Sequence, residues 1–246
     1  RVVALTAAEL GWRCKLVIHD KEDYTNGNLL LMKLAGAELI FCQLSEAPAV
    51  MDEAMSDLVK EGCRPYYIWG GGHSAEGSMA FYEAFQEVKS QIDFIPDYII
   101  LPSGTGTTHA GLHVGALLHN THTKVIGISV ARNRKRGKKV VEESVKELLL
   151  YLNKDNLKIS EVNFYDNWLY GGYAAVDEEV IKTIRWAAKE NGLILDPTYT
   201  GKAFTALVQL IEKGHIARKS KVLFWHTGGM MNLLSQFPVL KPAAIA

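Results

Sequence analysis

The stretch that is most informative about the fold is Pro102-Ser103-Gly104-Thr105-Gly106-Thr107-Thr108-His109-Ala110-Gly111. It follows an apolar run and leads into a helix-like segment. Small and hydroxylated residues let the backbone turn tightly and direct several N–H groups at one point. The positive end of the following helix adds to the attraction for an anion. The stretch predicts a phosphate-binding loop, with an ordinary strand-to-helix turn as the alternative.

The pattern of this loop excludes the two common nucleotide-binding motifs. His109 stands where a dinucleotide fingerprint places its third glycine, and the next strand ends in Ala131-Arg132 with no acid to hold a ribose. No Gly-Lys-Ser/Thr follows, as a Walker A motif requires. A small phosphorylated cofactor is the favoured ligand, and a nicotinamide oxidoreductase is a distant alternative.

Short apolar runs alternate with helix-like segments on both sides of the loop. The runs read as buried parallel strands and comprise Arg13–His19, Ala37–Cys42, Pro65–Trp69, Asp97–Leu101, Lys124–Val130, Leu193–Leu195 and Lys221–Trp225. The helices are expected over Gly27–Ala35, Pro48–Glu61, Ala75–Lys89, Thr108–Leu118, Glu142–Leu152, Glu178–Asn191 and Gly201–Lys213. This alternation predicts an α/β protein with open parallel sheets.

A run of three glycines, Gly70-Gly71-Gly72, marks the expected domain boundary. Residues 1–70 are predicted to form a small α/β domain and residues 71–246 a larger one. The stretch Arg1–Gly11 is predicted to be a helix that has no start signal of its own and ends at Gly11. The chain is therefore expected to begin inside a domain.

Composition narrows the class of protein. The 246 residues are 48% hydrophobic and 22% charged, and 27 basic residues balance 27 acidic ones. These values exclude a disordered chain, and nothing in the charge favours nucleic acid or a membrane surface as partner. The three cysteines form no CxxC pair, which predicts a reduced, cytoplasmic protein with buried thiols.

Two further turns follow predicted strands, where parallel sheets bind ligands. The first, Leu195–Lys202, sets Tyr199 beside Thr200, and the second is Trp225-His226-Thr227-Gly228-Gly229. The alternatives are a capped loop with a packing tyrosine and a simple turn.

Two other features carry less weight. His109 and His113 are spaced to share one helix face, but no third ligand is evident, so no metal site is predicted. The basic run Arg132–Lys139 is expected to be a solvated loop because acids follow it and the overall charge is neutral.

Taken together, the motifs resemble one family, the pyridoxal-phosphate (PLP) enzymes of fold type II, which are tryptophan synthase β-like. The closest group contains D-cysteine desulfhydrase and 1-aminocyclopropane-1-carboxylate (ACC) deaminase. The matching stretches are Arg1–Gly11, Asn26-Gly27-Asn28, Arg64–Gly72, Ser103–Gly111, Leu195–Ala203 and Phe224–Gly229. The resemblance implies two α/β domains with pyridoxal 5′-phosphate between them, a small amino-acid substrate and a homodimer.

The resemblance also implies a role for each matching residue. Ser103, Gly104, Thr105, Gly106, Thr107 and Thr108 would hold the cofactor phosphate, and His226, Thr227 and Gly228 would border the ring. Tyr199 and Tyr173 match two active-site tyrosines, and Thr200 falls where the family places the partner of the pyridine nitrogen.

Thr200 discriminates between the activities in this group. The deaminases resemble each other in carrying Glu there, and the desulfhydrases in carrying Thr. A hydroxyl leaves the ring a weaker electron sink than a carboxylate does, which suffices when the leaving group is as good as hydrosulfide. The predicted reaction is therefore elimination from D-cysteine to pyruvate, ammonia and hydrogen sulfide. ACC deamination and L-cysteate sulfo-lyase activity are the alternatives.

One departure from the family pattern concerns the lysine that forms the Schiff base. That lysine and its Ser-Asn pair match positions before Arg1, and Lys202 does not correspond to the lysine. Activity is thus expected to require upstream residues. The alternative of another class is a non-catalytic module that binds a phosphorylated ligand.

Overall fold

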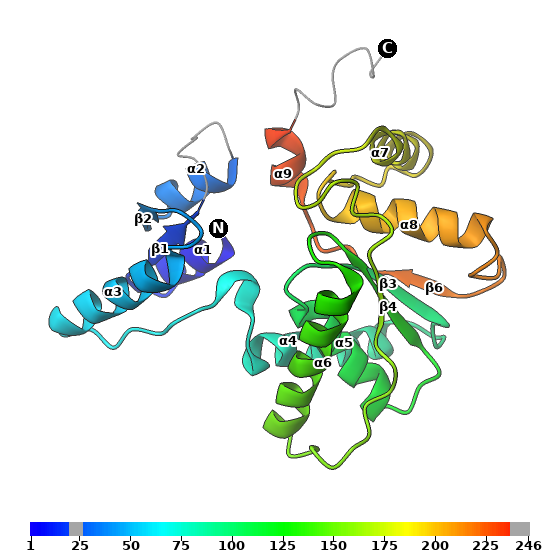
Figure 1. Cartoon of the computed structure of the whole chain (residues 1–246), viewed down its shortest axis with the longest axis horizontal. Helices are drawn as coiled ribbons and strands as arrows, with labels where there is room; N and C mark the ends of the chain where they lie inside the picture. The colour runs from blue at the N-terminus through cyan, green and yellow to red at the C-terminus, as the bar shows by residue number, and fades with distance from the viewer. Residues whose placement is uncertain (20–26, 237–246) are drawn as a thin grey trace. The chain divides into compact units, whose positions relative to one another are not determined.

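The computed structural model describes residues 1–19 and 27–236, which form two compact units (Figure 1). Of the described residues, the first unit comprises those of Arg1–Ile68 together with 231–236, and the second is Trp69–Met230. The sequence-based division placed residues 231–236 in the larger domain, whereas the structure groups them with Arg1–Ile68. Asn26, one residue of the family resemblance, lies outside the described residues.

The first unit contains a parallel two-stranded sheet. Its strands β1 (Lys15–Ile18) and β2 (Glu38–Phe41) pair with Lys15 opposite Glu38, and these two side chains form an ion pair at 3.4 Å. Its helices are α1 (Val2–Glu9), α2 (Gly27–Leu34) and α3 (Ala47–Lys60). Helix α9 (Met230–Ser235) begins at the junction of the two units, and the amide of Gly27 donates to its Ser235 hydroxyl.

The second unit is built on a parallel four-stranded sheet in the order β5-β4-β3-β6. The strands are β3 (Tyr98–Ser103), β4 (Lys124–Ser129), β5 (Asn163–Tyr165) and β6 (Val222–Phe224). A short 3-10 turn (Gly70–Gly72) leads into α4 (Ala75–Gln91), and the other helices are α5 (Thr107–Leu118), α6 (Arg134–Tyr151), α7 (Glu178–Asn191) and α8 (Thr200–Glu212).

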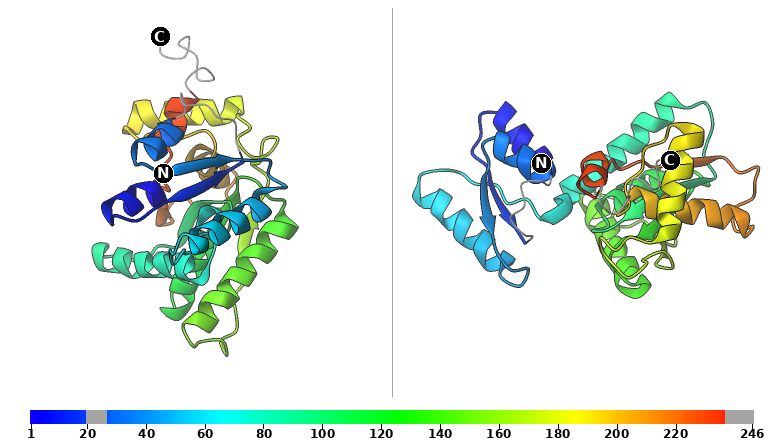
Figure 2. Two further views of the ribbon diagram at one scale, coloured as in Figure 1. Left: turned by 90° about the vertical axis from the view of Figure 1, so that its left-hand side faces the viewer. Right: turned by 90° about the horizontal axis from the view of Figure 1, so that it is seen from above.

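Both faces of this sheet are covered, as the continuous apolar runs predict (Figure 2). Alternate strand residues point to opposite faces because the side-chain period of a strand is two. One face packs its isoleucines on α8, namely Ile100, Ile126 and Ile128 with Ala203, Ala206 and Leu207. The other face packs on α5, with Ile99, Leu101 and Val125 against Leu112 and Ala116.

All four strands of the second unit point the same way, so their carboxyl ends meet at one edge of the sheet. The loops that follow β3, β4, β5 and β6 leave from this edge. Parallel sheets bind their ligands at such an edge. The predicted phosphate loop and the turn at His226 both lie there.

Several predicted elements need correction. Pro65–Trp69 and Leu193–Leu195 form no strand, because an apolar run becomes a strand only where a partner ladder is available. Strand β5 and helix α9 went unpredicted because each is too short to give a periodic signal. Helix α6 begins at Arg134, so most of the basic run is helical and not a loop.

Neither a membrane span nor a disulfide is found in the described part of the chain. No helix there is both long and apolar enough to cross a bilayer. Cys14, Cys42 and Cys63 are unpaired, and they are half-buried where the sequence predicted buried thiols.

Candidate active site

The predicted phosphate loop joins the end of β3 to the start of α5. Gly106 caps α5 with a φ of 99°, a left-handed conformation that favours glycine. A Cβ at this position would lie 3.3 Å from the Val141 side chain, so the loop passes close to α6. The hydroxyls of Thr105 and Thr107 are 3.2 Å apart.

This loop fits a phosphate group. The first N–H groups of the 12-residue α5 have no acceptor within the helix, and they face the loop. The Ser103 hydroxyl is buried without a hydrogen-bond partner among the described residues, which leaves a donor for a ligand oxygen. Glycines at 104 and 106 and hydroxyls on both sides provide the space and the remaining donors.

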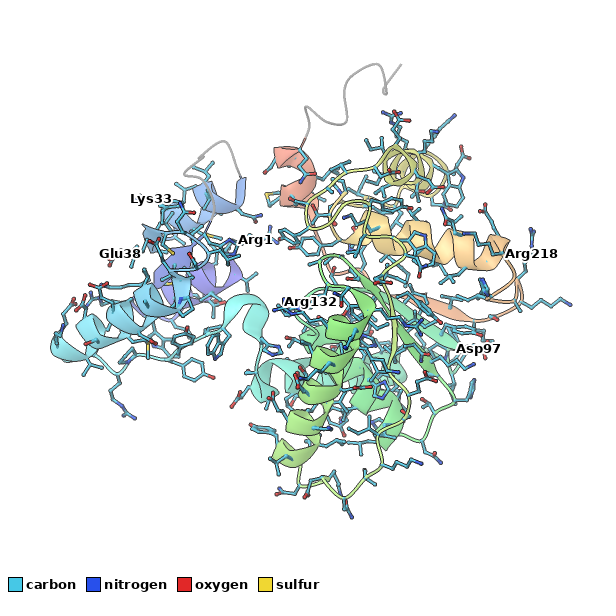
Figure 3. The ribbon with its side chains drawn as sticks, in the orientation of Figure 1. Arg1, Lys33, Glu38, Asp97, Arg132 and Arg218 are labelled. Carbon is cyan, nitrogen blue, oxygen red and sulfur yellow. The ribbon has the colours of Figure 1, made fainter. Side chains whose placement is uncertain are left out.

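Arg132 lies beside this loop, although the sequence analysis placed it in a basic run and gave it no role in a site. Its guanidinium donates to the carbonyl of Gly104, and it lies just before α6 (Figure 3). Burial and the nearby Arg136 lower the pKa of Arg132. No carboxylate of the described residues forms an ion pair with it. The prediction of a solvated loop was therefore wrong for this residue, which brings positive charge to the phosphate loop.

The turn before α8 is organised by the buried carboxylate of Asp196. Its oxygens accept from the backbone N–H groups of Thr198 at 3.0 Å, Tyr199 at 3.1 Å and Thr200 at 2.8 Å. Those of Tyr199 and Thr200 are amides that the start of α8 leaves without an acceptor, and a negative charge there is favourable. Gly229 packs directly on this carboxylate, since a Cβ there would lie 2.5 Å from Asp196 Oδ1.

Thr200 is fully buried in this turn. Its hydroxyl donates to Asp196 Oδ1 at 2.8 Å and accepts from the Asp196 N–H at 2.9 Å. The hydroxyl proton is thus held by Asp196. To donate to a pyridine nitrogen, Thr200 would have to release that bond, and its pairing with the ring stays a prediction.

The structure brings the two predicted tyrosines together. The hydroxyls of Tyr173 and Tyr199 form a short hydrogen bond, and their rings meet edge-on with centroids 6.0 Å apart. Burial, then the bond to Tyr173, raises the pKa of Tyr199. The raised pKa favours the protonated hydroxyl of Tyr199 at neutral pH, which can donate a hydrogen bond.

The turn after β6 is held by His226. Its Nε2 donates to the carbonyl of Ile194 at 2.8 Å, and its Nδ1 accepts from the Gly228 N–H at 3.1 Å. These partners assign the neutral tautomer with the proton on Nε2. Thr227 is exposed at the tip of the turn.

The remaining residues singled out in the sequence lie in or near helix α5. Within the described residues, no hydrogen bond links Thr105 or Thr107 to the tyrosine pair. Thr108 is half-buried in the first turn of α5. His109 and His113 lie on the core side of α5, and the described residues contain no group of three or more side chains suited to a metal ion.

The fold and these loops define an α/β enzyme that binds a small phosphorylated cofactor at the carboxyl edge of a parallel sheet. The family described as "Pyridoxal-phosphate dependent enzyme" matches residues 1–228. The chain belongs to this family, has its fold type II architecture and uses pyridoxal phosphate as its cofactor.

Relatives of known sequence and structure agree with this assignment. A protein of Pyrococcus furiosus named "Putative 1-aminocyclopropane-1-carboxylate deaminase" is 35% identical over 235 residues, covering 93% of this chain and 70% of the relative. A Pyrococcus abyssi protein of the same name is 35% identical over 238 residues, with the same coverage.

Two solved structures are also similar. The structure of an ACC deaminase homologue has a TM-score of 0.87 at 32% identity and covers 97% of this chain and 73% of its own. Serine racemase from Dictyostelium discoideum has a TM-score of 0.59 at 15% identity, covers 92% of this chain and 71% of its own, and shares the fold.

Proposed function

We propose that this chain serves a PLP-dependent lyase that eliminates a β-substituent from a small amino acid, with D-cysteine as the first substrate to test. D-Cysteine and water would give pyruvate, ammonia and hydrogen sulfide. The Cα–H and Cβ–S bonds break, the sulfur leaves with its electron pair, and water replaces nitrogen at Cα. No oxidant or reductant is needed.

The observation that carries this proposal is the turn at Asp196. The Asp196 carboxylate already accepts from three backbone amides and one hydroxyl, so it is not free to pair with a ligand. The side chain at position 200 is that of a threonine, which offers a hydroxyl and not an acid. When bound, pyridoxal phosphate supplies a sink for the electrons left at Cα. A neutral partner at the ring nitrogen makes a weaker sink, which suits a good leaving group such as hydrosulfide.

The chain's own residues have distinct tasks in this proposal. The loop Ser103–Thr108 binds the phosphate, and Arg132 fixes that loop through the Gly104 carbonyl. The two hydroxyls of Tyr173 and Tyr199 carry two protons, of which their mutual bond uses one. The second proton is available to a substrate carboxylate or to the departing sulfur.

ACC deamination is the second candidate, and the names of the two Pyrococcus relatives favour it. It would open a cyclopropane ring to give 2-oxobutyrate and ammonia. Elimination of sulfite from L-cysteate is a third possibility within the same chemistry.

The test is a parallel assay on the full-length protein that contains this sequence. The protein is incubated with pyridoxal phosphate and D-cysteine, L-cysteine, L-cysteate or ACC, and sulfide, sulfite, pyruvate and 2-oxobutyrate are measured. Sulfide and pyruvate from D-cysteine alone are the expected result. Formation of 2-oxobutyrate from ACC would overturn the argument from Thr200. Binding of pyridoxamine 5′-phosphate without any turnover would favour a non-catalytic binding module.

The homodimer, which the family resemblance implies, and the cytoplasmic location, which the cysteine pattern predicts, both stay predictions. Sedimentation velocity of the full-length protein tests the first, and fractionation of the source cells tests the second.

A further inference from the structure

Lys202 is a lysine without exposed surface, two residues after Thr200 on α8. Its ammonium donates to the carbonyl of Leu169 at 2.9 Å and to the carbonyl of Gly172 at 2.7 Å. Both acceptors belong to the segment between β5 and α7, which is far from Lys202 in the sequence and carries Tyr173.

The two carbonyls close consecutive turns of this segment. The Leu169 carbonyl also accepts from the Gly172 N–H at 3.1 Å, and the Gly172 carbonyl from the Ala175 N–H at 3.3 Å. The backbone is left-handed at Tyr170 (φ 49°) and Ala174 (φ 58°), which is unfavourable for residues other than glycine. Such a conformation persists where surrounding contacts hold it.

Burying an ammonium group in a protein core is energetically unfavourable. Removing it from water is unfavourable, and burial lowers the pKa of Lys202, although the Asp196 carboxylate raises it. No carboxylate of the described residues pairs with it directly. Its direct partners in the structure are the two loop carbonyls, so the charge is used to hold that loop.

We propose that Lys202 is a positioning residue that fixes the loop Leu169–Ala175 and so holds the Tyr173 hydroxyl against Tyr199. The inference rests on the role proposed above for the tyrosine pair. It adds a link through which the helix that begins at Thr200 sets the place of a second active-site side chain.

Two other bonds hold the same segment at different points. The indole of Trp168 donates to Gln209 Oε1 at 3.0 Å, and the Tyr170 hydroxyl donates to Glu179 Oε2 at 2.9 Å. Both attach side chains that precede Gly171. Lys202 instead holds the carbonyl adjacent to Tyr173, so its loss should affect that tyrosine most directly.

The first experiment measures the loop itself. Hydrogen exchange of the backbone amides of residues 171–175 is compared between the wild type, Lys202→Met and Lys202→Arg in the full-length protein. We expect at least tenfold faster exchange in Lys202→Met and a largely restored rate in Lys202→Arg, which keeps a charged donor.

The control is Gln209→Met, which removes the Trp168 bond from the same helix and should leave these amides protected. Unchanged exchange in Lys202→Met would overturn the proposal whatever the substrate. If Lys202→Met does not fold, Lys202→Gln, which keeps a neutral donor, is measured instead.

The second experiment is a double-mutant cycle on turnover of the substrate identified above. Lys202→Met should lower kcat by about 10- to 100-fold with a smaller change in KM, as a displaced proton donor predicts. Adding Tyr173→Phe should cause little further loss, because both changes remove the same placed hydroxyl. Fully additive losses would overturn the proposed link. If Tyr173→Phe alone has no effect, the role of the tyrosine pair fails, and the exchange experiment still decides whether Lys202 orders the loop.

Discussion

Asp196 is the residue on which the turn before α8 depends. A single buried carboxylate accepts from three consecutive amides leading into the helix and also fixes the Thr200 hydroxyl. The position of Thr200 is thus set by hydrogen bonds within its own turn, before any ligand is bound.

Removing the Thr200 hydroxyl should therefore destabilise the protein. Thr200→Val keeps the shape but leaves the Asp196 N–H without its acceptor and the carboxylate without one donor. We expect the free energy of unfolding to fall by about 1–3 kcal/mol, measured by urea denaturation. Thr200→Ser retains the hydroxyl, so its free energy of unfolding should fall by less than that of Thr200→Val. Equal stability of Thr200→Val and the wild type would contradict this account.

Arg132 should contribute to phosphate binding. Arg132→Met removes a charged donor from the Gly104 carbonyl, and we expect the Kd for pyridoxamine 5′-phosphate to rise about tenfold by isothermal titration calorimetry. The Kd for pyridoxamine, which has no phosphate, should change little. Lys135→Gln, an exposed cation of the same run, is the control for long-range charge. An equal loss of affinity for both ligands would refute a role in phosphate recognition.

At the scale of elements, β4 and α5 approach closely because Gly127 has no side chain. A Cβ at Gly127 would lie 2.3 Å from His109 Nδ1 and 2.9 Å from the Ser103 Cβ. The His109 ring fills this space between β4 and Phe164. It stacks on the Phe164 ring, with the two ring centroids 6.4 Å apart. The start of α5, and with it the phosphate loop, is positioned by this packing.

Gly127→Ala should therefore strain the contact between β4 and α5. We expect a loss of about 1–3 kcal/mol of stability, because the buried His109 ring and the Ser103 Cβ would both have to move. Phosphate affinity should weaken as the loop shifts. The control is Gly70→Ala, where an added methyl meets no atom within 4 Å. Thermal unfolding of the two variants compares them, and a Gly127→Ala protein as stable as Gly70→Ala would contradict the packing argument.

At the scale of the whole molecule, two buried histidines link stability to pH. Burial, with a further contribution from His113, lowers the pKa of His109 to about 3, and burial lowers the pKa of His113 to about 4. In the unfolded chain both titrate near 6.5. Between pH 6.5 and about 4 the unfolded state therefore binds more protons, and stability falls as the pH falls.

His109→Gln should make the protein less sensitive to acid. Each histidine contributes a slope of up to about 1.4 kcal/mol per pH unit, and the variant loses one of them. Urea unfolding at pH 7.5 and pH 5 measures the difference, which should be smaller in the variant than in the wild type. His215→Gln removes an exposed histidine and controls for a general charge effect. An unchanged pH dependence in His109→Gln would contradict the assigned burial effect.

Local sequence predicted those elements whose signal is local. Apolar runs such as Asp97–Leu101 became strands, and the small residues at 103–108 became the turn into α5. Leu193–Leu195 has the same apolar character but finds no strand beside it, which no local pattern reveals. Strand β5 exists because it pairs with β4, although its three residues carry little signal of their own.

The sequence by itself determined the α/β class and the family, and it predicted the phosphate loop, because these follow from residue types at fixed spacing. Only the tertiary structure showed which side chains from distant parts of the sequence meet at these loops. Arg132 and Lys202 act on backbone carbonyls 28 and 30 to 33 residues away, and Tyr173 meets Tyr199 across 26 residues. Such contacts depend on how strands and helices pack, so no spacing in the sequence encodes them.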